Sequence, residues 1–358
     1  MSEKIKFSVI GFGHIGKRHA KMIAENPETE LVSVVDPGED KREDFRVLGY
    51  NASFYTDHKE FLAEDNKQTE VIVICTPNGL HVPIALDVLE KRYHVVIEKP
   101  MGLTKAGCEQ VIFKSLQVSR HVFVVKQNRY SPPSRWLKKM MEEQKIGDVN
   151  MVQINCYWNR DDRYYNKDGW KGTLNLDGGT LFTQFSHFID IMYWVFGDIK
   201  NVHAHFSNFN HSESTEFEDS GVVQFDFVNG GMGCINFSTA CWDQNMESSI
   251  TVIGSKGSLK IGGQYMNEIE YCHVDGYEME ELEEISPPND YGPYKGSAAN
   301  HHFVIQNVVD TLRDRSTITA NALEGLKVVE IIERIYQSRN LANLNSTAVP
   351  RPKHYELT

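Results

Sequence analysis

The sequence contains no long apolar run, and none approaches the ~18–20 residues that a membrane-spanning helix needs. Cysteine is scarce and scattered without C-x-x-C spacing, at positions Cys75, Cys108, Cys156, Cys234, Cys241 and Cys272. This distribution disfavours a disulfide framework or a zinc site and favours a reducing compartment. The first residues lead directly into a strand-like run, so we expect no signal peptide. We therefore expect a cytoplasmic protein with no membrane partner and no bound metal.

Basic residues are fewer than acidic residues. The 37 Lys and Arg residues against 49 Asp and Glu residues give a formal net charge of −12 at pH 7. This balance disfavours nucleic acid as the partner, but it does not exclude an anionic substrate, because local basic groups can override the global field. The 41% hydrophobic content is typical of a globular protein, and 358 residues favour two domains.

The first third of the chain alternates strand-like and helix-like segments. The apolar runs with strand character are Phe7–Ile10, Leu31–Val35, Val71–Cys75, Val95–Ile97 and Val122–Val125. The helix-like segments between them are Gly16–Asn26, His58–Glu64, Val82–Lys91 and Lys105–Ser119. This alternation predicts an α/β Rossmann domain, a doubly wound parallel sheet with helices on both faces, over residues 1–126.

The pattern changes after about residue 127. Longer strand-like runs follow, punctuated by glycine turns, at Val149–Tyr157, Val202–Phe209, Val222–Val228, Met232–Thr239 and Ser249–Ile253. Helices are expected at Gly179–Phe196 and near residues 300–313 and 322–339. This predicts a C-terminal α+β domain with a large, mostly antiparallel sheet over residues 127–340, followed by an arm over 341–358.

A glycine-rich loop follows the first strand without extra residues. It reads Gly11-Phe12-Gly13-His14-Ile15-Gly16, the G-x-G-x-x-G pattern that binds a dinucleotide pyrophosphate at a helix start. A structural turn and a methyltransferase loop are the alternatives. Asp36 ends the second strand 20 positions after Gly16, where a carboxylate binds the adenosine ribose hydroxyls. A carboxylate there repels a 2′-phosphate, so we expect NAD rather than NADP.

Two further strand ends carry polar residues. Thr76-Pro77-Asn78 follows the fourth predicted run, with His81 three residues later, and we expect this segment to contact the cofactor; a plain turn is the alternative. Glu98-Lys99-Pro100 follows the next run. Ligands in open α/β sheets lie outside the carboxyl ends of the strands, so Lys99 is a candidate catalytic residue and Glu98 a candidate cofactor contact. The Lys99–Pro100 peptide bond is a candidate for the cis form.

The predicted helix at residues 179–196 is apolar almost all round and should be buried. Thr183, His187 and Asp190 fall at i, i+4 and i+7, on one face of it. A buried helix with such a polar stripe needs a polar cavity or a partner. The alternative is a core histidine hydrogen-bonded to Thr183 or Asp190. No ligand spacing indicates a metal.

These motifs together resemble the Gfo/Idh/MocA oxidoreductase family over about residues 5–340. The family usually carries D-x-G-x-H-x-x-D on the later helix, and members with a catalytic triad use the first Asp beside the Lys and His. Here His187 and Asp190 match, whereas Thr183 and Phe185 replace the Asp and the Gly. The resemblance therefore implies a Lys99–His187 pair, with simple polyol chemistry less secure.

Within the family, the chain looks similar to nucleotide-sugar oxidases such as the UDP-N-acetylglucosaminuronate 3-dehydrogenases. The similar stretches are Gln127-Asn128-Arg129-Tyr130, Gly169-Trp170-Lys171-Gly172 and Tyr294-Lys295-Gly296-Ser297 followed by His301. Gln127 is expected at the cofactor. Trp170 could stack on a sugar or base, Arg129, Lys171, Lys295 and Ser297 could meet a carboxylate or phosphates, and the resemblance adds His301 as a substrate contact. Each also has a plain interpretation as a surface or loop residue.

The resemblance implies NAD-dependent oxidation of a sugar ring hydroxyl in a homodimer or homotetramer. His187 is the more natural base and Lys99 would stabilise the developing alkoxide, although burial of the lysine could exchange the two roles. Two alternatives stay open. One is a family member that hydrolyses or epimerises through transient oxidation, and the other is a regulator that binds NAD and sugar without chemistry.

Overall fold

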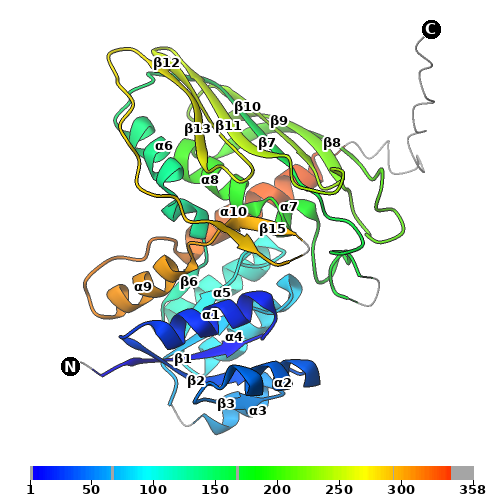
Figure 1. Ribbon diagram of the computed structural model, residues 1–358, viewed down its shortest axis with the longest axis vertical. Coiled ribbons are helices and arrows are strands. Elements are labelled where there is room, and N and C mark those ends of the chain that lie inside the picture. Colours follow the sequence, from blue (N-terminus) through cyan, green and yellow to red (C-terminus); the bar gives the residue numbers. More distant parts are fainter. Residues whose placement is uncertain (1–2, 66–67, 167–168, 293, 340–358) are drawn as a thin grey trace. The chain divides into compact units, whose positions relative to one another are not determined.

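The computed structural model describes residues 3–65, 68–166, 169–292 and 294–339. The chain forms two compact units (Figure 1). Within the described ranges, the first unit comprises residues 3–130 and 299–330, and the second comprises residues 131–298 and 331–339. The predicted arm at 341–358 lies outside the described residues. None of the helices in the described ranges is both long and apolar enough to cross a membrane.

The first unit is built on a six-stranded, fully parallel sheet in the order β3-β2-β1-β4-β5-β6. Its strands are β1 (Ile5–Ile10), β2 (Thr29–Val35), β3 (Ser53–Tyr55), β4 (Val71–Ile74), β5 (His94–Ile97) and β6 (Val122–Val124). Central strands such as β4 are buried on both faces, which explains their continuous apolar sequence. This order confirms the predicted doubly wound sheet and places its switch point between β1 and β4.

The helices of this unit are α1 (His14–Glu25), α2 (Glu39–Leu48), α3 (His58–Glu64), η1 (Asn78–Leu80), α4 (His81–Glu90), α5 (Lys105–Val118), η2 (Gln127–Tyr130), α9 (His301–Leu312) and the first part of α10 (Ala322–Gln337). Side chains cap three of them: Asp57 accepts from the first turn of α3, Thr104 from that of α5 and Asn321 from that of α10. Neither α2 nor β3 was predicted from the sequence. α2 buries no side chain and so lacks a buried apolar stripe, and β3 has only three residues.

The segment 299–330 belongs to the first unit, whereas the sequence analysis assigned it to the second domain. Val304, Ile305 and Val308 of α9 lie in the same buried cluster as Phe7 and Val71. At the edge of the sheet, the Val124 N–H donates to the Ala320 carbonyl at 3.0 Å. The chain therefore returns to complete the first core, a long-range contact that reading domains in sequence order does not reveal.

The second unit contains a seven-stranded sheet in the order β13-β12-β11-β7-β10-β9-β8. Its strands are β7 (Val149–Tyr157), β8 (Ile199–Ser207), β9 (Ser220–Phe227), β10 (Met232–Ser238), β11 (Glu247–Gly254), β12 (Gly257–Gly262) and β13 (Glu268–Val274). All neighbours pair antiparallel except β7 and β10, which confirms the mostly antiparallel prediction. A separate two-stranded ladder joins β14 (Pro288–Asp290) to β15 (Lys295–Ala298).

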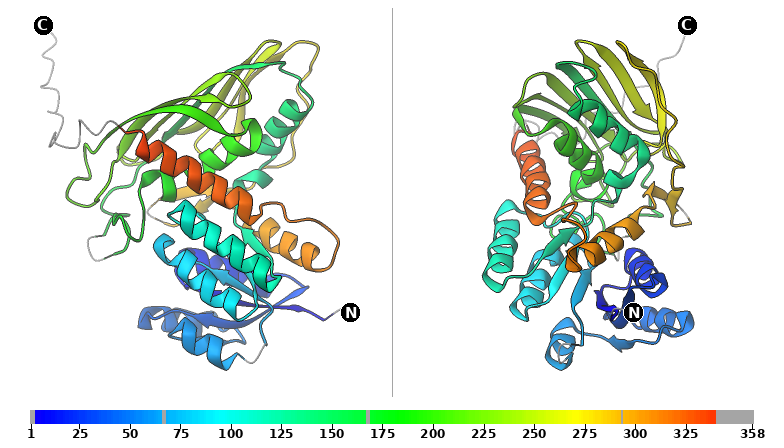
Figure 2. Two further views of the ribbon diagram at one scale, coloured as in Figure 1. Left: turned by 180° about the vertical axis from the view of Figure 1, so that it is seen from behind. Right: turned by 90° about the vertical axis from the view of Figure 1, so that its left-hand side faces the viewer.

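Helices cover one face of this sheet. They are α6 (Pro132–Glu142), α7 (Thr180–Thr183) and α8 (Ser186–Phe196), and Figures 1 and 2 show α6 and α8 on the same side. Aromatic pairs fix α8 to the strands, with Phe188 against Trp158 at 5.8 Å between ring centroids and Phe196 against Phe227 at 5.5 Å.

The predicted helix 179–196 is two helices rather than one. α7 ends at Thr183, α8 begins at Ser186, and the Phe185 N–H bonds the Thr180 carbonyl five residues back at 3.2 Å. The break falls between Thr183 and His187, so these two residues do not share a regular helical face as predicted. Only His187 and Asp190 keep helical spacing, at i and i+3 on α8.

A buried carboxyl group lies beside this helix pair and makes stability depend on pH. Glu218 is buried and accepts a hydrogen bond from the Tyr336 hydroxyl at 2.7 Å. Burial raises the pKa of Glu218 to about 7, because removal from water disfavours its charged form. The native state therefore binds this proton more tightly than the unfolded chain, and the resulting stabilisation is complete below about pH 4.5 and is lost as pH rises through about 7.

Glu218→Gln should raise the free energy of unfolding at pH 8 by roughly 3 kcal/mol, with a much smaller gain at pH 5. Denaturant unfolding at both pH values measures the change. Glu278→Gln, at an exposed position of the same unit, is the matched control. Equal effects of Glu218→Gln at pH 5 and pH 8 would contradict the assignment.

Candidate active site

The glycine loop after β1 is shaped by contacts that only glycine permits. Gly11 has φ 92°, and a Cβ there would lie 2.6 Å from the Cys75 carbonyl oxygen. A Cβ on Gly16 would lie 1.9 Å from the Gly11 oxygen, whereas a Cβ on Gly13 meets nothing within 4 Å. Gly11 and Gly16 therefore pack the loop against the end of β4, and Gly13 leaves open space beside the backbone.

The start of α1 is suited to phosphate. No side chain caps it, and its first turn contains no acidic residue. The backbone amides at the helix start and the positive end of the helix dipole are therefore not neutralised by a carboxylate in the first turn of α1. The open space at Gly13 and this helix start fit a dinucleotide pyrophosphate.

Asp36 lies against the same loop. Its two carboxylate oxygens accept from the Phe12 N–H at 2.7 Å and from the Gly38 N–H at 2.9 Å. Each oxygen keeps a lone pair for a further donor. The residue directly follows β2, the strand next to β1, and its position fits the predicted contact with ribose hydroxyls.

His81 joins the ends of β4 and β5. Its ring nitrogens lie 2.9 Å from the Thr76 carbonyl and 2.7 Å from the Pro100 carbonyl, and burial lowers the pKa of this histidine. A fully buried ring between two backbone segments positions them rather than presenting itself to a ligand. The Thr76 hydroxyl is buried and has no hydrogen-bond partner among the described residues, and a cofactor oxygen or amide would satisfy it.

Glu98 is the centre of a buried cluster at the end of β5. Its Oε1 lies 2.7 Å from His19 Nε2 and 3.7 Å from His301 Nε2, and its Oε2 accepts from the Lys99 N–H at 3.1 Å. Burial opposes ionisation, but the hydrogen bond and charge of His19 prevail and lower the pKa of Glu98 to about 2. Glu98 is therefore an anion that holds the backbone of half-buried Lys99, and the Lys99–Pro100 bond is cis.

The donor atoms of His19, Glu98 and His301 lie within 4.8 Å of one another. These are residue types that bind divalent metals. The 2.7 Å contact between His19 and Glu98 is, however, the length of a direct hydrogen bond with no ion between the two atoms. His19 was not among the predicted residues; its spacing of three residues after the last glycine of the loop is the one signal in the sequence that points to it.

Two residues predicted at the substrate are buried inside the first unit. His301 is 1% exposed beside Glu98, and burial lowers its pKa to about 3, so its ring is neutral. Arg129 is 2% exposed and forms an ion pair with Glu324 at 2.6 Å. Both side chains are thus surrounded by protein groups, and their predicted contact with a substrate stays a prediction. Gln127, predicted at the cofactor, is buried in the same short helix as Arg129.

In the second unit, a carboxylate that the sequence analysis missed stands beside Thr183. The Thr183 hydroxyl donates to the Asp177 carboxylate, and Asp177 also accepts from the Gly172 N–H at 2.8 Å. Asp177 is fully buried. Thr183 stands where the family usually has its first Asp. The contact with Asp177 therefore places a carboxylate beside position 183, although residue 183 itself is not acidic. His187 and Asp190 are both buried on α8, as predicted.

The other predicted substrate residues differ in exposure. Trp170 is half-buried, Lys295 is exposed and Ser297 is buried. The Lys171 ammonium lies 3.8 Å from the centre of the Tyr164 ring and donates to the Tyr294 hydroxyl at 3.3 Å. Lys171 therefore lies against aromatic rings rather than in open solvent.

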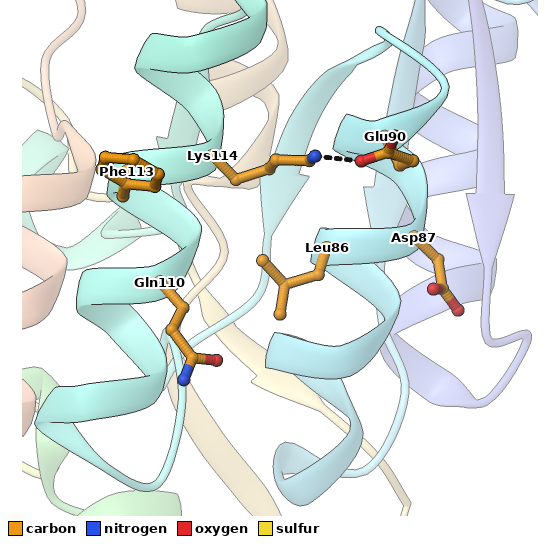
Figure 3. Close-up of a pocket in the computed structure, with 6 residues that line it drawn as sticks. All are labelled: Leu86, Asp87, Glu90, Gln110, Phe113 and Lys114. Atoms are coloured by element: carbon orange, nitrogen blue, oxygen red, sulfur yellow. Dashed lines mark ion pairs between the residues drawn. The ribbon is translucent and has the colours of Figure 1, made fainter.

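A surface pocket between α4 and α5 is separate from these residues (Figure 3). It is lined by Leu86, Asp87, Glu90, Gln110, Phe113 and Lys114, and Lys114 pairs with Glu90 across it. None of these residues lies on the glycine loop or at a strand end. We therefore assign the pocket no part in the chemistry.

The glycine loop, Asp36 and Lys99 lie at the carboxyl edge of one parallel sheet, where dinucleotide-binding enzymes place their cofactor. The family model "Oxidoreductase family, NAD-binding Rossmann fold" matches residues 5–125, and "GFO/IDH/MocA C-terminal domain" matches residues 134–260. The chain belongs to the Gfo/Idh/MocA oxidoreductase family. The predicted family, fold class and NAD cofactor are thereby confirmed for this oxidoreductase.

Solved and curated relatives agree with this placement. The WlbA dehydrogenase of Bordetella pertussis, crystallised with NADH and UDP-GlcNAcA, is 29% identical, with a TM-score of 0.82 over 94% of this chain and 96% of its own. The WlbA dehydrogenase of Chromobacterium violaceum, also with NADH and UDP-GlcNAcA, is 29% identical, with a TM-score of 0.83 over 94% of each chain. The myo-inositol 2-dehydrogenase of Thermotoga maritima is 25% identical over 71% of this chain and 74% of its own.

The Asp36 carboxylate should set the cofactor preference of this oxidoreductase. We expect the wild type to bind NAD at least roughly tenfold more tightly than NADP, equivalent to about 1.4 kcal/mol, because the carboxylate repels a 2′-phosphate. Asp36→Asn should weaken NAD binding and bring the affinities for NAD and NADP closer together. Calorimetric titration with both cofactors measures these affinities, with Glu39→Gln, an exposed carboxylate three residues on, as the control. Tighter NADP binding by the wild type would refute the assignment.

Proposed function

We propose that this oxidoreductase transfers hydride between NAD and a carbon that carries a ring hydroxyl of a sugar or nucleotide sugar. The observation that carries the proposal is the placement of Lys99. Lys99 lies at the carboxyl end of β5. In the same sheet, β4 lies next to β5 and leads to Thr76, and β1 lies next to β4 and leads to the glycine loop. The names of the relatives, which include WlbA dehydrogenases with NADH and UDP-GlcNAcA and an inositol dehydrogenase, support a substrate with oxidisable CH–OH groups.

In this proposal Lys99 and His187 act on the same substrate carbon. His187 takes the hydroxyl proton, because a neutral imidazole nitrogen accepts protons. Lys99 stabilises the negative charge that develops on the oxygen. The glycine loop and Asp36 would hold NAD, which would supply the hydride acceptor in the oxidative direction. Glu98 holds Lys99 through its backbone N–H and is a positioning residue.

The substrate contacts are proposed on the second unit. Trp170 offers an aromatic face for a sugar or base, and Lys171, Lys295 and Ser297 offer donors for a carboxylate or phosphate. The partial exposure of Trp170 and Lys171 supports this role, since a ligand must reach both side chains.

Lys99→Met and His187→Ala should each lower turnover by roughly 10²–10⁴-fold. His187→Ala removes the group that accepts the proton, and Lys99→Met removes the group that stabilises the developing negative charge. Absorbance of reduced nicotinamide during addition of a sugar and nucleotide-sugar panel measures turnover, and calorimetry should find NAD binding retained. Lys59→Met and His273→Ala, at exposed positions of the respective units, are the controls.

Wild-type rates in both site variants would refute the assigned roles. A product formed without net change in free NAD would instead support transient oxidation followed by hydrolysis or epimerisation. A protein that binds NAD and sugar with no turnover would support a regulator.

We also propose a cytoplasmic homo-oligomer. All six cysteines are free thiols, which suits a reducing compartment. On the sheet face opposite α8, Met232 and Ile253 both lie directly across from Met151 on neighbouring strands. These three side chains are exposed and form an apolar patch suited to contact with a second copy.

Met151→Glu should therefore dissociate the oligomer, because it places a charge in the centre of the patch. Light scattering coupled to size-exclusion chromatography gives the mass. Phe113→Glu replaces a more exposed apolar residue on α5 and should leave the mass unchanged. A monomeric wild type would contradict this proposal.

A further inference from the structure

A buried arginine in the second unit has no carboxylate partner. Arg160 is 3% exposed, and its guanidinium donates to neutral oxygens only: the carbonyls of Asn159 at 2.5 Å and Lys295 at 3.2 Å, and Asn245 Oδ1 at 3.1 Å. Across the described ranges, no Asp or Glu lies within ion-pair distance of it, and its buried Nε has no hydrogen-bond partner. Its charge is therefore hydrogen-bonded but not neutralised.

Aromatic rings enclose this guanidinium. Its central carbon lies 4.7 Å from the ring centre of Trp158, 4.9 Å from that of Tyr294 and 5.3 Å from that of Tyr164. Cation–π contacts stabilise a cation in such a site, but the rings bring no net negative charge. The positive field of Arg160 thus extends beyond them.

A second cation shares two of these rings. The Lys171 ammonium lies 3.8 Å from the centre of Tyr164 and 5.3 Å from that of Tyr294. Among the residues that the structure describes, its hydrogen-bond partner is the neutral Tyr294 hydroxyl. Burial, and next the charge of Arg160, lowers the pKa of Lys171 to about 8, while the buried Asp177 carboxylate acts in the opposite direction.

Two cations on one pair of tyrosines repel each other, and an anion between protein and solvent would relieve that repulsion. We propose that Lys171 and the Tyr294 hydroxyl, backed by the charge of Arg160, form a subsite for an anionic oxygen group of the substrate. The group is the carboxylate of a hexuronate or the diphosphate of a nucleotide sugar. The inference rests on the proposed function for its substrate class.

The charge of the whole chain makes such a subsite necessary for an anionic ligand. The formal net charge of −12 repels anions at long range, so binding needs a local positive field. Lys171 and Tyr294 are half-buried and can reach a ligand, whereas Arg160 is enclosed. The two former groups therefore touch the anion, and Arg160 strengthens the field.

A purely structural role for the cluster is the competing explanation, because Arg160 also fixes the Lys295 backbone. The two explanations differ in one respect. A structural role affects charged and neutral ligands alike, whereas an anion subsite discriminates between them.

Calorimetry on the NADH-loaded protein tests the difference with four ligands: UDP-GlcNAcA, UDP-GlcNAc, free N-acetylglucosaminuronate and free N-acetylglucosamine. Lys171→Gln should weaken binding of the ligands that carry the recognised anion by roughly tenfold or more and change the others little. Loss confined to the two ligands with a carboxylate identifies the carboxylate, and loss confined to the two UDP ligands identifies the diphosphate. Lys171→Arg should retain most of the affinity, and Lys200→Gln, at an exposed position on β8, is the control.

Affinity of the wild type for the anionic ligand should also fall as pH rises above about 8, where Lys171 loses its proton, and this fall should be absent in Lys171→Gln. The neighbouring charged or titratable groups are Arg160, Asp177, Tyr164 and Tyr294; burial raises the pKa of both tyrosines, so they stay protonated in this range.

Equal losses for all four ligands in Lys171→Gln, no loss for any, or a wild type that binds no anionic ligand would each overturn the subsite. Because the readout is binding, its failure is separable from that of the proposed function. A protein that shows the predicted anion dependence without oxidising any sugar retains the subsite and refutes the hydride-transfer assignment.

Discussion

The close backbone contact between the glycine loop and the end of β4 is the constraint on which the first unit depends. Gly11 adopts φ 92° with its Cα against the Cys75 carbonyl, and Gly16 approaches the Gly11 oxygen closely enough that any side chain would collide. This contact brings the start of α1 to the switch point of the parallel sheet. The helix amides, Asp36 and the orphaned Thr76 hydroxyl then face the same edge as a consequence of strand order.

The buried Glu98 carboxylate performs a related task one strand further along. It joins His19 of α1, the backbone of Lys99 and the ring of His301 at the start of α9. A buried anion is costly unless it is hydrogen-bonded, so these contacts fix the three segments together. The helix that carries the glycine loop and the strand end that carries Lys99 are thereby positioned by one carboxylate.

In the second unit the placement of charge is more informative than the placement of apolar residues. Asp177 stands beside Thr183, where the family's usual carboxylate is missing, and two cations lie against a common pair of tyrosines. Although the family motif has no Asp at position 183 here, a carboxylate from the loop before α7 lies next to that position. The same loop region also carries Lys171, so one short segment places both an anion and a cation.

The sequence by itself determined the parallel sheet, the dinucleotide loop, the candidate carboxylate at Asp36 and the Lys99 strand end, because these depend on local order: an apolar run, a turn and the residue that follows. It also indicated that residues 149–157 form a strand and that His187 lies on a buried helix. Tertiary structure alone decided the rest. Residues 299–330 return to the first core, and His301 and Arg129 are enclosed there, through contacts between segments far apart in sequence. The break between α7 and α8 depends on local packing. The surroundings of His19, Asp177 and Arg160 likewise depend on which segments pack against them. Such contacts leave no periodicity in the chain, since a buried charge is identified by what surrounds it and not by the residues on either side.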